Sequence, residues 1–287
     1  MHVLVTGASG LVGEAICYYF ISENCKVTGI VNSSSLNIIN GNYTELTLNL
    51  LETHLVLSQK KYDAVIHCAA IIADATKTNE ELFATNQKID ALVFNFCITH
   101  HIKLIYFSTA YLYANNTNNT LNESSLINDE LEGYYLSKYT SEQQLINSDI
   151  NYVVYRLSSP YGNYQKQNNV MKLFINKMKN NDDVTLLGKG ERSQNFIHTQ
   201  DIAEVCLLSL NHTIKGIYNL CYDRTYSMYE LASVIKTTLR SNSEIRCDES
   251  KKDTIINVNF SNVKLCYALN WRPKYNLENG IQQTLLT

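Results

Sequence analysis

Three glycines close to the start of the chain constrain its fold more than any other feature. Gly7, Gly10 and Gly13 directly follow the apolar run at residues 2–6 and open a helical pattern. In such a turn the first glycine permits a tight bend, the second lets the backbone approach a pyrophosphate, and the third allows close helix–strand packing. The motif therefore predicts a dinucleotide-binding turn. The residues expected to line it are Gly7, Ser9, Gly10, Leu11, Val12 and Gly13.

The first half of the chain alternates short β-branched runs with longer helical segments, a pattern typical of a parallel sheet. The predicted strands cover residues 2–6, 26–31, 43–48, 63–68, 103–107 and 152–156. The predicted helices cover residues 11–23, 79–100 and 133–147, and a polar loop covers residues 114–131. Beyond Ser158 the alternation loosens, with helical stretches near residues 169–179, 199–210 and 227–240.

This order of elements predicts an α/β fold, with a Rossmann-type doubly wound parallel sheet and a smaller mixed α/β C-terminal substrate lobe. We expect residues 1–158 to form the NAD(P)-binding Rossmann domain, with strand and helix returns from the C-terminal half. Residues 159–287 are expected to form the smaller substrate-binding lobe.

The composition of the chain excludes several classes of binding partner. The net charge is −3 and the basic residues form no cluster, which argues against nucleic acid or an anionic membrane as a partner. No apolar run approaches the ~20 residues of a membrane helix, and cleavage of a signal peptide would remove the glycine motif itself. We therefore expect a cytoplasmic protein. Its eight cysteines include no Cys-x-x-Cys pair, so reduced, buried thiols are expected rather than disulfides or a metal site.

The end of the second predicted strand bears on the choice between NAD and NADP. An acidic residue there would hold the ribose hydroxyls of NAD and repel a 2′-phosphate. The chain instead has Val31, then Asn32 and a run of serines that begins at Ser33. The hydroxyl groups could accept a phosphate, although no arginine lies nearby to bind one. Both NAD and NADP therefore stay open, with NADP slightly favoured. Asn32 and Ser33 are expected to contact the adenosine ribose of either cofactor.

Two segments predict a catalytic group. Tyr134 and Lys138 are four residues apart and so share one helix face. A tyrosine with its ordinary pKa of about 10 is a poor base at neutral pH, and we expect the lysine cation to lower that pKa while it also binds the nicotinamide ribose. Thr109 follows the fifth predicted strand, at the sheet edge where open α/β sheets bind ligands. Its hydroxyl is expected to hydrogen-bond the substrate oxygen.

Together these residues resemble the extended short-chain dehydrogenase/reductases of the NAD-dependent epimerase/dehydratase family. Within it the likeness is to the nucleotide-sugar branch that contains UDP-galactose 4-epimerase, and it runs through nearly the whole chain. The further segments that carry the likeness are residues 65–70, 156–162, 188–203 and 269–281.

The resemblance implies further binding residues. Those implied for the cofactor, beside Tyr134 and Lys138, are Asn49, Leu50, Cys68, Ala69, Ala70, Asn86 and Ser159. Those implied for the substrate are Thr109, Ala110, Tyr111, Asn163, Arg192 and Gln194. It also implies a homodimer that pairs the helices near residues 79–100 and 133–147 of each subunit.

Two departures from the family pattern concern the reaction. Family 4,6-dehydratases have Asp-Glu directly after the catalytic threonine, but this chain has Ala110 and Tyr111, so dehydration is disfavoured. In the nucleotide-contacting strand the family often has an arginine where this chain has Gln194, with Arg192 two residues earlier. A guanidinium at Arg192 could still bind a diphosphate through two hydrogen bonds.

The leading hypothesis is oxidoreduction at C4 of a nucleoside-diphosphate sugar, either as 4-keto reduction or as 4-epimerisation. The short chain and the missing ribose acid favour the reductase, because a dissociable NADPH suits a one-way reduction. Two alternatives stay open. One is an NAD(P)H-dependent reductase of a non-nucleotide carbonyl compound, which the departure at Gln194 supports. The other is a non-catalytic NAD(P)-binding sensor or scaffold, against which the presence of Thr109, Tyr134 and Lys138 argues.

Overall fold

A computed structural model describes residues 1–51, 61–72, 76–113, 120–164, 169–253 and 258–285. Its centre is a seven-stranded sheet in which every neighbouring pair is parallel. Across the sheet the strands are β11 (Gly216–Leu220), β7 (Tyr152–Leu157), β5 (Lys103–Thr109), β4 (Ala64–His67), β1 (His2–Thr6), β2 (Lys26–Val31) and β3 (Tyr43–Thr47). The strand order reverses between β1 and β4, where doubly wound sheets bind their ligands.

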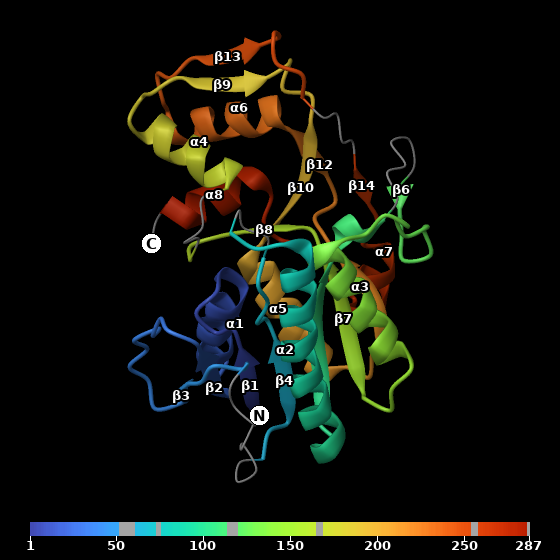
Figure 1. Cartoon of the computed structure of the whole chain (residues 1–287). Helices are drawn as coiled ribbons and strands as arrows, with labels where there is room; N and C mark the ends of the chain where they lie inside the picture. The colour runs from blue at the N-terminus through green and yellow to red at the C-terminus, as the bar shows by residue number, and fades with distance from the viewer. Residues whose placement is uncertain (52–60, 73–75, 114–119, 165–168, 254–257, 286–287) are drawn as a thin grey trace.

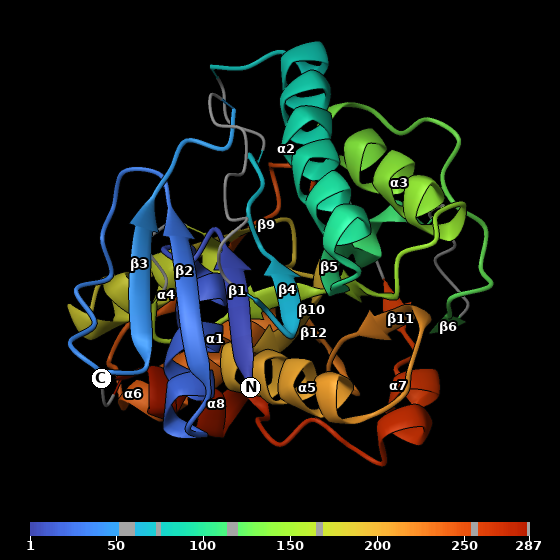
Figure 2. The same ribbon diagram turned by 90° about the horizontal axis from the view of Figure 1, so that it is seen from below.

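Helices cover both faces of the sheet (Figures 1 and 2). One face carries α1 (Leu11–Ser22), α5 (Thr199–Asn211) and α7 (Val263–Leu269), and the other carries α2 (Asn79–His100) and α3 (Gly133–Ile146). Because both faces are covered, the central strands are buried on both sides and read as nearly continuous apolar runs. Helix α2 begins at a capping box between Thr78 and Glu81, which defines its first turn.

A smaller lobe lies at one end of the sheet, at the top of Figure 1. Its helices are α4 (Val170–Lys179), α6 (Met228–Leu239) and α8 (Leu277–Leu285). Its strands are the pair β9 (Val184–Leu187) and β13 (Ile245–Asp248), and the set β12 (Thr225–Ser227), β10 (Ser193–His198) and β8 (Ser159–Tyr161). The chain enters the lobe where β8 follows the carboxyl end of β7. The lobe has its own apolar core between α4, α6 and α8. We propose that the boundary between the dinucleotide-binding domain and this lobe lies after residue 158.

A small apolar cluster lies beside the sheet, separate from the cores of the sheet and the lobe. It joins the short helix η1 (Ala110–Leu112) with β6 (Thr120–Leu121) and β14 (Asn259–Phe260), two strands that pair in parallel although they lie far apart in the chain. This cluster forms one wall of the cavity described below.

The predicted fold class is confirmed, and the predicted strands and helices of the first 157 residues occur within about two residues of their expected bounds. The polar loop predicted over residues 114–131 is wrong at residues 120–121, which form β6, whereas residues 122–131 contain no helix or extended strand. Residues 114–119 lie outside the described residues. In the part of the chain that the structure describes, no helix has the length and apolar content to cross a membrane.

Candidate active site

The glycine turn has the tight geometry that the motif predicts. Gly7 adopts a left-handed conformation (φ +62°), and a Cβ there would lie 2.7 Å from the backbone of Ala69. A Cβ on Gly13 would lie 2.3 Å from the carbonyl oxygen of Gly7, so α1 packs directly on the turn. Gly10 is the N-cap of α1 and supplies no capping side chain. Backbone N–H groups at such a helix start fit a pyrophosphate, so these residues fit the expected dinucleotide.

The segment after β4 lies against this turn. Cys68 and Ala69 approach Gly7 closely enough to exclude any side chain there. Asn86, which the resemblance implies as a cofactor contact, binds the backbone of Ile71 in both directions: its side-chain oxygen accepts from Ile71 N–H and its amide donates to Ile71 O, over 2.8 and 3.0 Å. Asn86 therefore holds the segment that includes Ala70 in place.

The loop that follows β2 is held by a residue of β3, Glu45, that the sequence analysis missed. Asn32 and Ser33 are exposed, while the Glu45 carboxylate on β3 accepts hydrogen bonds from Leu36 N–H (3.0 Å) and the Tyr43 hydroxyl (3.1 Å). Partial burial raises the pKa of Glu45, but these bonds and one from Ser35 hold it below its ordinary value overall.

Glu45 therefore places a negative charge beside the loop that follows β2. The parallel pairing of β2 and β3 sets Glu45 beside Gly29, a placement that no local sequence pattern indicates. Asn49 and Leu50, two further expected contacts, are half-buried just beyond β3.

The expected catalytic residues come from two elements that pack together, β5 and α3. Thr109 is the last residue of β5 and is buried, and its hydroxyl accepts from Tyr111 N–H at 3.2 Å. Lys138 is 2% exposed, and its Nζ lies 5.8 Å from the centre of the Tyr134 ring. Gly133, with φ +50°, starts α3 against Asn79 of α2, where a Cβ would clash at 2.5 Å.

The expected lowering of the Tyr134 pKa is not what the protein alone produces. Burial raises the pKa of Tyr134 above its ordinary value, and Tyr135 and Asp90 raise it further. The Lys138 ammonium lies over a different ring, 4.5 Å from the centre of Tyr106. The prediction of an acidified phenol is therefore corrected: in the protein alone, Tyr134 is held in the protonated form.

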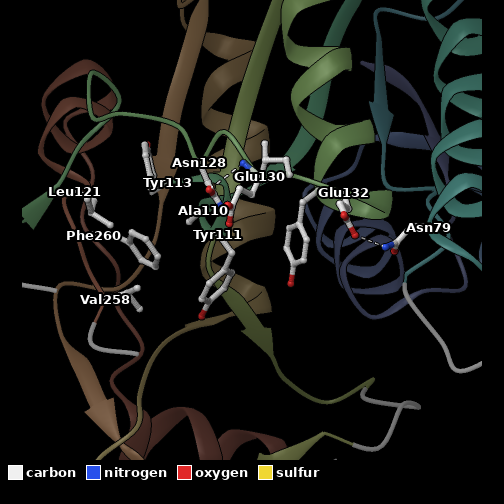
Figure 3. A pocket seen from close by; sticks show the side chains of 12 residues that line it. Asn79, Ala110, Tyr111, Tyr113, Leu121, Asn128, Glu130, Glu132, Val258 and Phe260 are labelled. Atoms are coloured by element: carbon white, nitrogen blue, oxygen red, sulfur yellow. Dashed lines mark hydrogen bonds between the residues drawn. The ribbon is translucent and has the colours of Figure 1, made fainter. Parts of the chain in front are cut away.

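A cavity of about 410 Å³ opens beside η1 (Figure 3). The Tyr111 side chain projects between an apolar wall at Val258 and Phe260 and a polar wall at Glu132 and Asn79. Asn79 donates to Glu132 across 2.6 Å. The other lining residues are Ala110, Tyr113, Leu121, Asn128, Glu130, Leu131 and Tyr135.

Three of the predicted ligand contacts meet in one polar cluster. Ser159 accepts a hydrogen bond from Gln194 and lies 3.0 Å from the Tyr111 hydroxyl. Ser159, expected near the cofactor, therefore joins the residues expected near the substrate. Arg192 is exposed, and the side-chain oxygen of Asn163 has no hydrogen-bond partner among the described residues.

A buried ion pair fixes α3 on the sheet. Arg156 of β7 donates from Nε and Nη2 to the Glu142 carboxylate, the Nη2 bond measuring 2.7 Å, and both side chains are almost fully buried. The described residues contain no group of three or more His, Cys, Asp or Glu side chains placed to bind a metal ion. The site thus combines a dinucleotide-shaped turn with a half-buried phenol, a buried ammonium and a buried hydroxyl, which suits proton and hydride transfer at an alcohol or ketone.

Comparison with known proteins agrees with this architecture. The profile of the NAD dependent epimerase/dehydratase family matches residues 3–221. A structure of UDP-glucose 4-epimerase from Thermotoga maritima, solved with UDP-glucose, superposes with a TM-score of 0.89 at 21% identity, covering 100% of this chain and 98% of that one.

Similar sequences have names that cover several reactions. A putative UDP-glucose 4-epimerase of Methanocaldococcus jannaschii is 25% identical over 99% of this chain and 97% of its own. A dTDP-4-dehydro-6-deoxyglucose reductase of Escherichia coli is 22% identical over 99% of this chain and 96% of its own. Proteins named dTDP-D-glucose 4,6-dehydratase also match nearly the whole chain.

Proposed function

Because this chain belongs to the NAD dependent epimerase/dehydratase family, we propose that it performs oxidoreduction at C4 of a nucleoside-diphosphate sugar. The observation that carries the proposal is the packing of β5 against α3, which brings Thr109 toward the helix face of Tyr134 and Lys138 at the ligand-binding edge of the sheet.

Each side chain has a distinct proposed role. Tyr134 gives a proton to the C4 oxygen or takes one from it, and Thr109 orients that oxygen through its hydroxyl. Lys138 supplies the positive charge beside the phenol and a donor for the nicotinamide ribose. Gly7, Gly10 and the first turn of α1 would hold the pyrophosphate. The nicotinamide cofactor supplies or accepts the hydride when it is bound.

A protonated Tyr134 favours the reductase reaction, in which a 4-keto sugar is reduced. Burial raises the pKa of Tyr134, so the residue starts as a phenol and can protonate the oxygen that reduction creates. A 4-epimerase must first remove a proton from the C4 hydroxyl, which needs the phenolate. Epimerisation is the second candidate, and the name of one relative, a putative UDP-glucose 4-epimerase, supports it.

Dehydration is not proposed, although dehydratases are among the relatives. The two residues after Thr109 are a buried alanine, Ala110, and Tyr111, whose hydroxyl lies 3.0 Å from Ser159. Neither carries a carboxyl group. The cavity does hold the carboxyl groups of Glu130 and Glu132, but they come from the segment before α3, and Glu132 accepts a hydrogen bond from Asn79.

We further propose that the chain prefers NAD(H). The sequence pointed toward NADP because β2 ends without an acidic residue. Glu45 supplies a carboxylate beneath the same loop, bonded to Leu36 N–H at 3.0 Å, and residues 27–51 contain no lysine or arginine. A 2′-phosphate would therefore meet a negative charge without a compensating cation.

We also propose a homodimer formed through the outer faces of α2 and α3. These helices lie side by side on one face of the sheet (Figure 2) and expose Ile98, Leu136 and Ile146. A second copy of the same surface would bury these side chains in a four-helix contact.

Turnover of defined nucleotide sugars tests the proposed reaction. The protein is incubated with NADH or NADPH and UDP-, dTDP- or GDP-linked 4-keto sugars, and separately with NAD⁺ or NADP⁺ and the corresponding 4-hydroxy sugars. Stoichiometric cofactor oxidation with a 4-keto sugar supports the reductase, and C4 inversion without net oxidation supports the epimerase. Formation of a 4-keto-6-deoxy sugar would instead identify a dehydratase. Absence of both turnover and thermal protection with every nucleotide sugar would overturn the proposal.

A further inference from the structure

A carboxylate in the middle of α2 is buried close to the proposed catalytic residues. Asp90 is 1% exposed, and its two oxygens accept hydrogen bonds from three other elements. His67 Nε2 at the end of β4 donates to Oδ1 across 2.9 Å. The hydroxyls of Tyr106 on β5 and Ser141 on α3 donate to Oδ2 across 2.7 and 2.6 Å. Three donors around one carboxyl group favour its ionised form.

The surrounding charge favours the same form. Burial raises the pKa of Asp90, but the positive charge of Lys138 and the hydrogen bonds from His67 and Ser141 outweigh burial and lower the pKa below its ordinary value. The hydrogen bonds and the nearby ammonium therefore both favour the ionised form of Asp90.

On one side, the hydrogen bonds continue from Asp90 to the glycine turn. Because His67 donates from Nε2, its Nδ1 is assigned as an acceptor, and the Thr6 hydroxyl donates to it across 2.6 Å. The Thr6 oxygen in turn accepts from Ala69 N–H at 3.3 Å. Thr6 directly precedes Gly7, and the backbone of Ala69 is the surface on which Gly7 packs. Every donor and acceptor in this series is thereby matched.

On the other side, the ring of Tyr106 lies between Asp90 and Lys138. The Lys138 ammonium lies 4.5 Å from the centre of the Tyr106 ring, and the hydroxyl of that ring donates to Asp90. Burial lowers the pKa of Lys138 below its ordinary value, and Asp90, Cys68 and Glu142, in that order of importance, offset part of that lowering. Of these, Glu142 is already paired with Arg156, and burial strongly raises the pKa of the Cys68 thiol. Tyr106 and Tyr134 also lie beside the ammonium, and burial raises the pKa of both phenols.

We propose that Asp90 is a positioning residue whose buried charge keeps Lys138 an ammonium ion and whose hydrogen bonds join α3 to the glycine turn. Without that charge, Lys138 would be a buried cation with no unpaired carboxylate near it among the described residues, a state that favours loss of its proton. The role given to Lys138 rests on the proposed function, whereas its charge state can be measured without any substrate.

A titration of the full chain tests the charge state directly. Protein labelled with ¹⁵N-lysine is titrated without cofactor, and Lys138→Met identifies the Nζ resonance of Lys138. The expected result is an ammonium Nζ at pH 7.5. A neutral amine at that pH would overturn the proposal, and this measurement requires no altered protein other than the assignment variant.

Two variants then separate charge from hydrogen bonding. Asp90→Asn removes the charge with little change of shape, whereas Tyr106→Phe removes one hydrogen bond to the same carboxylate and keeps both the charge and the ring beneath Lys138. We expect Asp90→Asn to lower the midpoint of the Lys138 titration by about one pH unit or more, and Tyr106→Phe to leave it nearly unchanged. An unchanged midpoint in folded Asp90→Asn protein, or equal shifts in both variants, would contradict the proposal.

The pH profile of kcat supplies the link to the reaction. If the proton on Lys138 is needed for turnover, the alkaline limb of the Asp90→Asn profile moves to lower pH by the same interval as the titration midpoint. A purely structural Asp90 would lower thermal stability without moving that limb. A chain that shows the titration shift but no C4 activity would refute the proposed reaction alone.

Discussion

At the scale of single residues, the proposed chemistry depends most on Tyr134. Tyr134→Phe removes the proton that must reach the C4 oxygen, so we expect kcat to fall by about 10²- to 10⁴-fold. Cofactor affinity, measured by fluorescence titration, should change little because the glycine turn is untouched. Tyr139→Phe on the same helix is the matched control and should keep its activity. A fully active Tyr134→Phe protein would show that another group transfers the proton.

Glu45 makes a second prediction at this scale. Glu45→Gln removes the negative charge beneath the loop after β2, where Leu36 N–H donates to it. We expect the preference for NADH over NADPH, taken as the ratio of the two dissociation constants, to fall by about tenfold, an effect of about 1.4 kcal/mol. Glu23→Gln, at an exposed site just after α1, should leave the ratio unchanged. An identical ratio in both variants and the unaltered chain would exclude Glu45 as a determinant of cofactor choice.

The sequence indicates some of these residues and hides others, for physical reasons. Gly7, Tyr134 and Lys138 belong to local patterns, because a turn or a helix face brings together residues only a few positions apart. Asp90 and Glu45 act through partners far away in the chain or on a neighbouring strand, such as His67, which lies 23 positions from Asp90. A single carboxylate in a helix or strand carries no sign of such partners.

At the scale of elements, the buried ion pair between Glu142 and Arg156 holds α3 against the sheet. Glu142→Gln leaves the Arg156 guanidinium, 4% exposed as a residue, without its counter-charge. We expect the free energy of unfolding, measured with urea, to fall by about 3 to 5 kcal/mol. The same change at exposed Glu278 should cost less than about 0.5 kcal/mol. Equal stabilities for the two variants would mean that the pair does not anchor the helix.

The start of α5 carries two buried groups whose effects on stability oppose each other. Burial lowers the pKa of His198 from 6.5 to about 4, so only the unfolded chain binds its proton between these values, and stability falls as the pH falls through this window. Burial raises the pKa of Asp201 from 3.8 to about 6. The folded chain alone holds that proton, so the Asp201 contribution to stability rises as the pH falls from 6 toward 3.8.

Variants at these two positions should therefore respond to acid in opposite directions. Between pH 7 and pH 5, we expect His198→Asn to gain about 1 to 2 kcal/mol of stability and Asp201→Asn to lose a similar amount, each relative to the unaltered chain. Urea unfolding at the two pH values measures both. Parallel changes in the two variants would contradict the assigned protonation states.

The elements of the two halves of the chain differ in how far the sequence predicts them. In the first half, β1, β4 and β5 are buried on both faces, so each reads as a compact apolar run. In the second half, β8, β12 and β14 have only two or three residues each and pair with distant segments. Runs this short have no recognisable period, which explains why helices α4, α5 and α6 were predicted there and these strands were not.

At the scale of the whole molecule, the proposed homodimer makes the clearest prediction. Ile98→Arg and Ile146→Arg together would place charges on the outer faces of α2 and α3, so we expect sedimentation to change from a dimer to a monomer of 32.7 kDa. Tyr267→Arg, on the exposed side of α7, is the control and should leave the mass unchanged. A dimer that persists in the double variant would place the contact elsewhere.

The edge strand β11 has a consequence for how the protein folds during synthesis. Residues 216–220 pair with β7 and complete the sheet. When only the first 158 residues have left the ribosome, β7 is therefore an unpaired edge strand. Unpaired edges of this kind recruit other strands and promote aggregation. The nascent domain must therefore wait for a segment synthesised about sixty residues later, and a fragment ending near residue 158 would be a poor choice for separate expression.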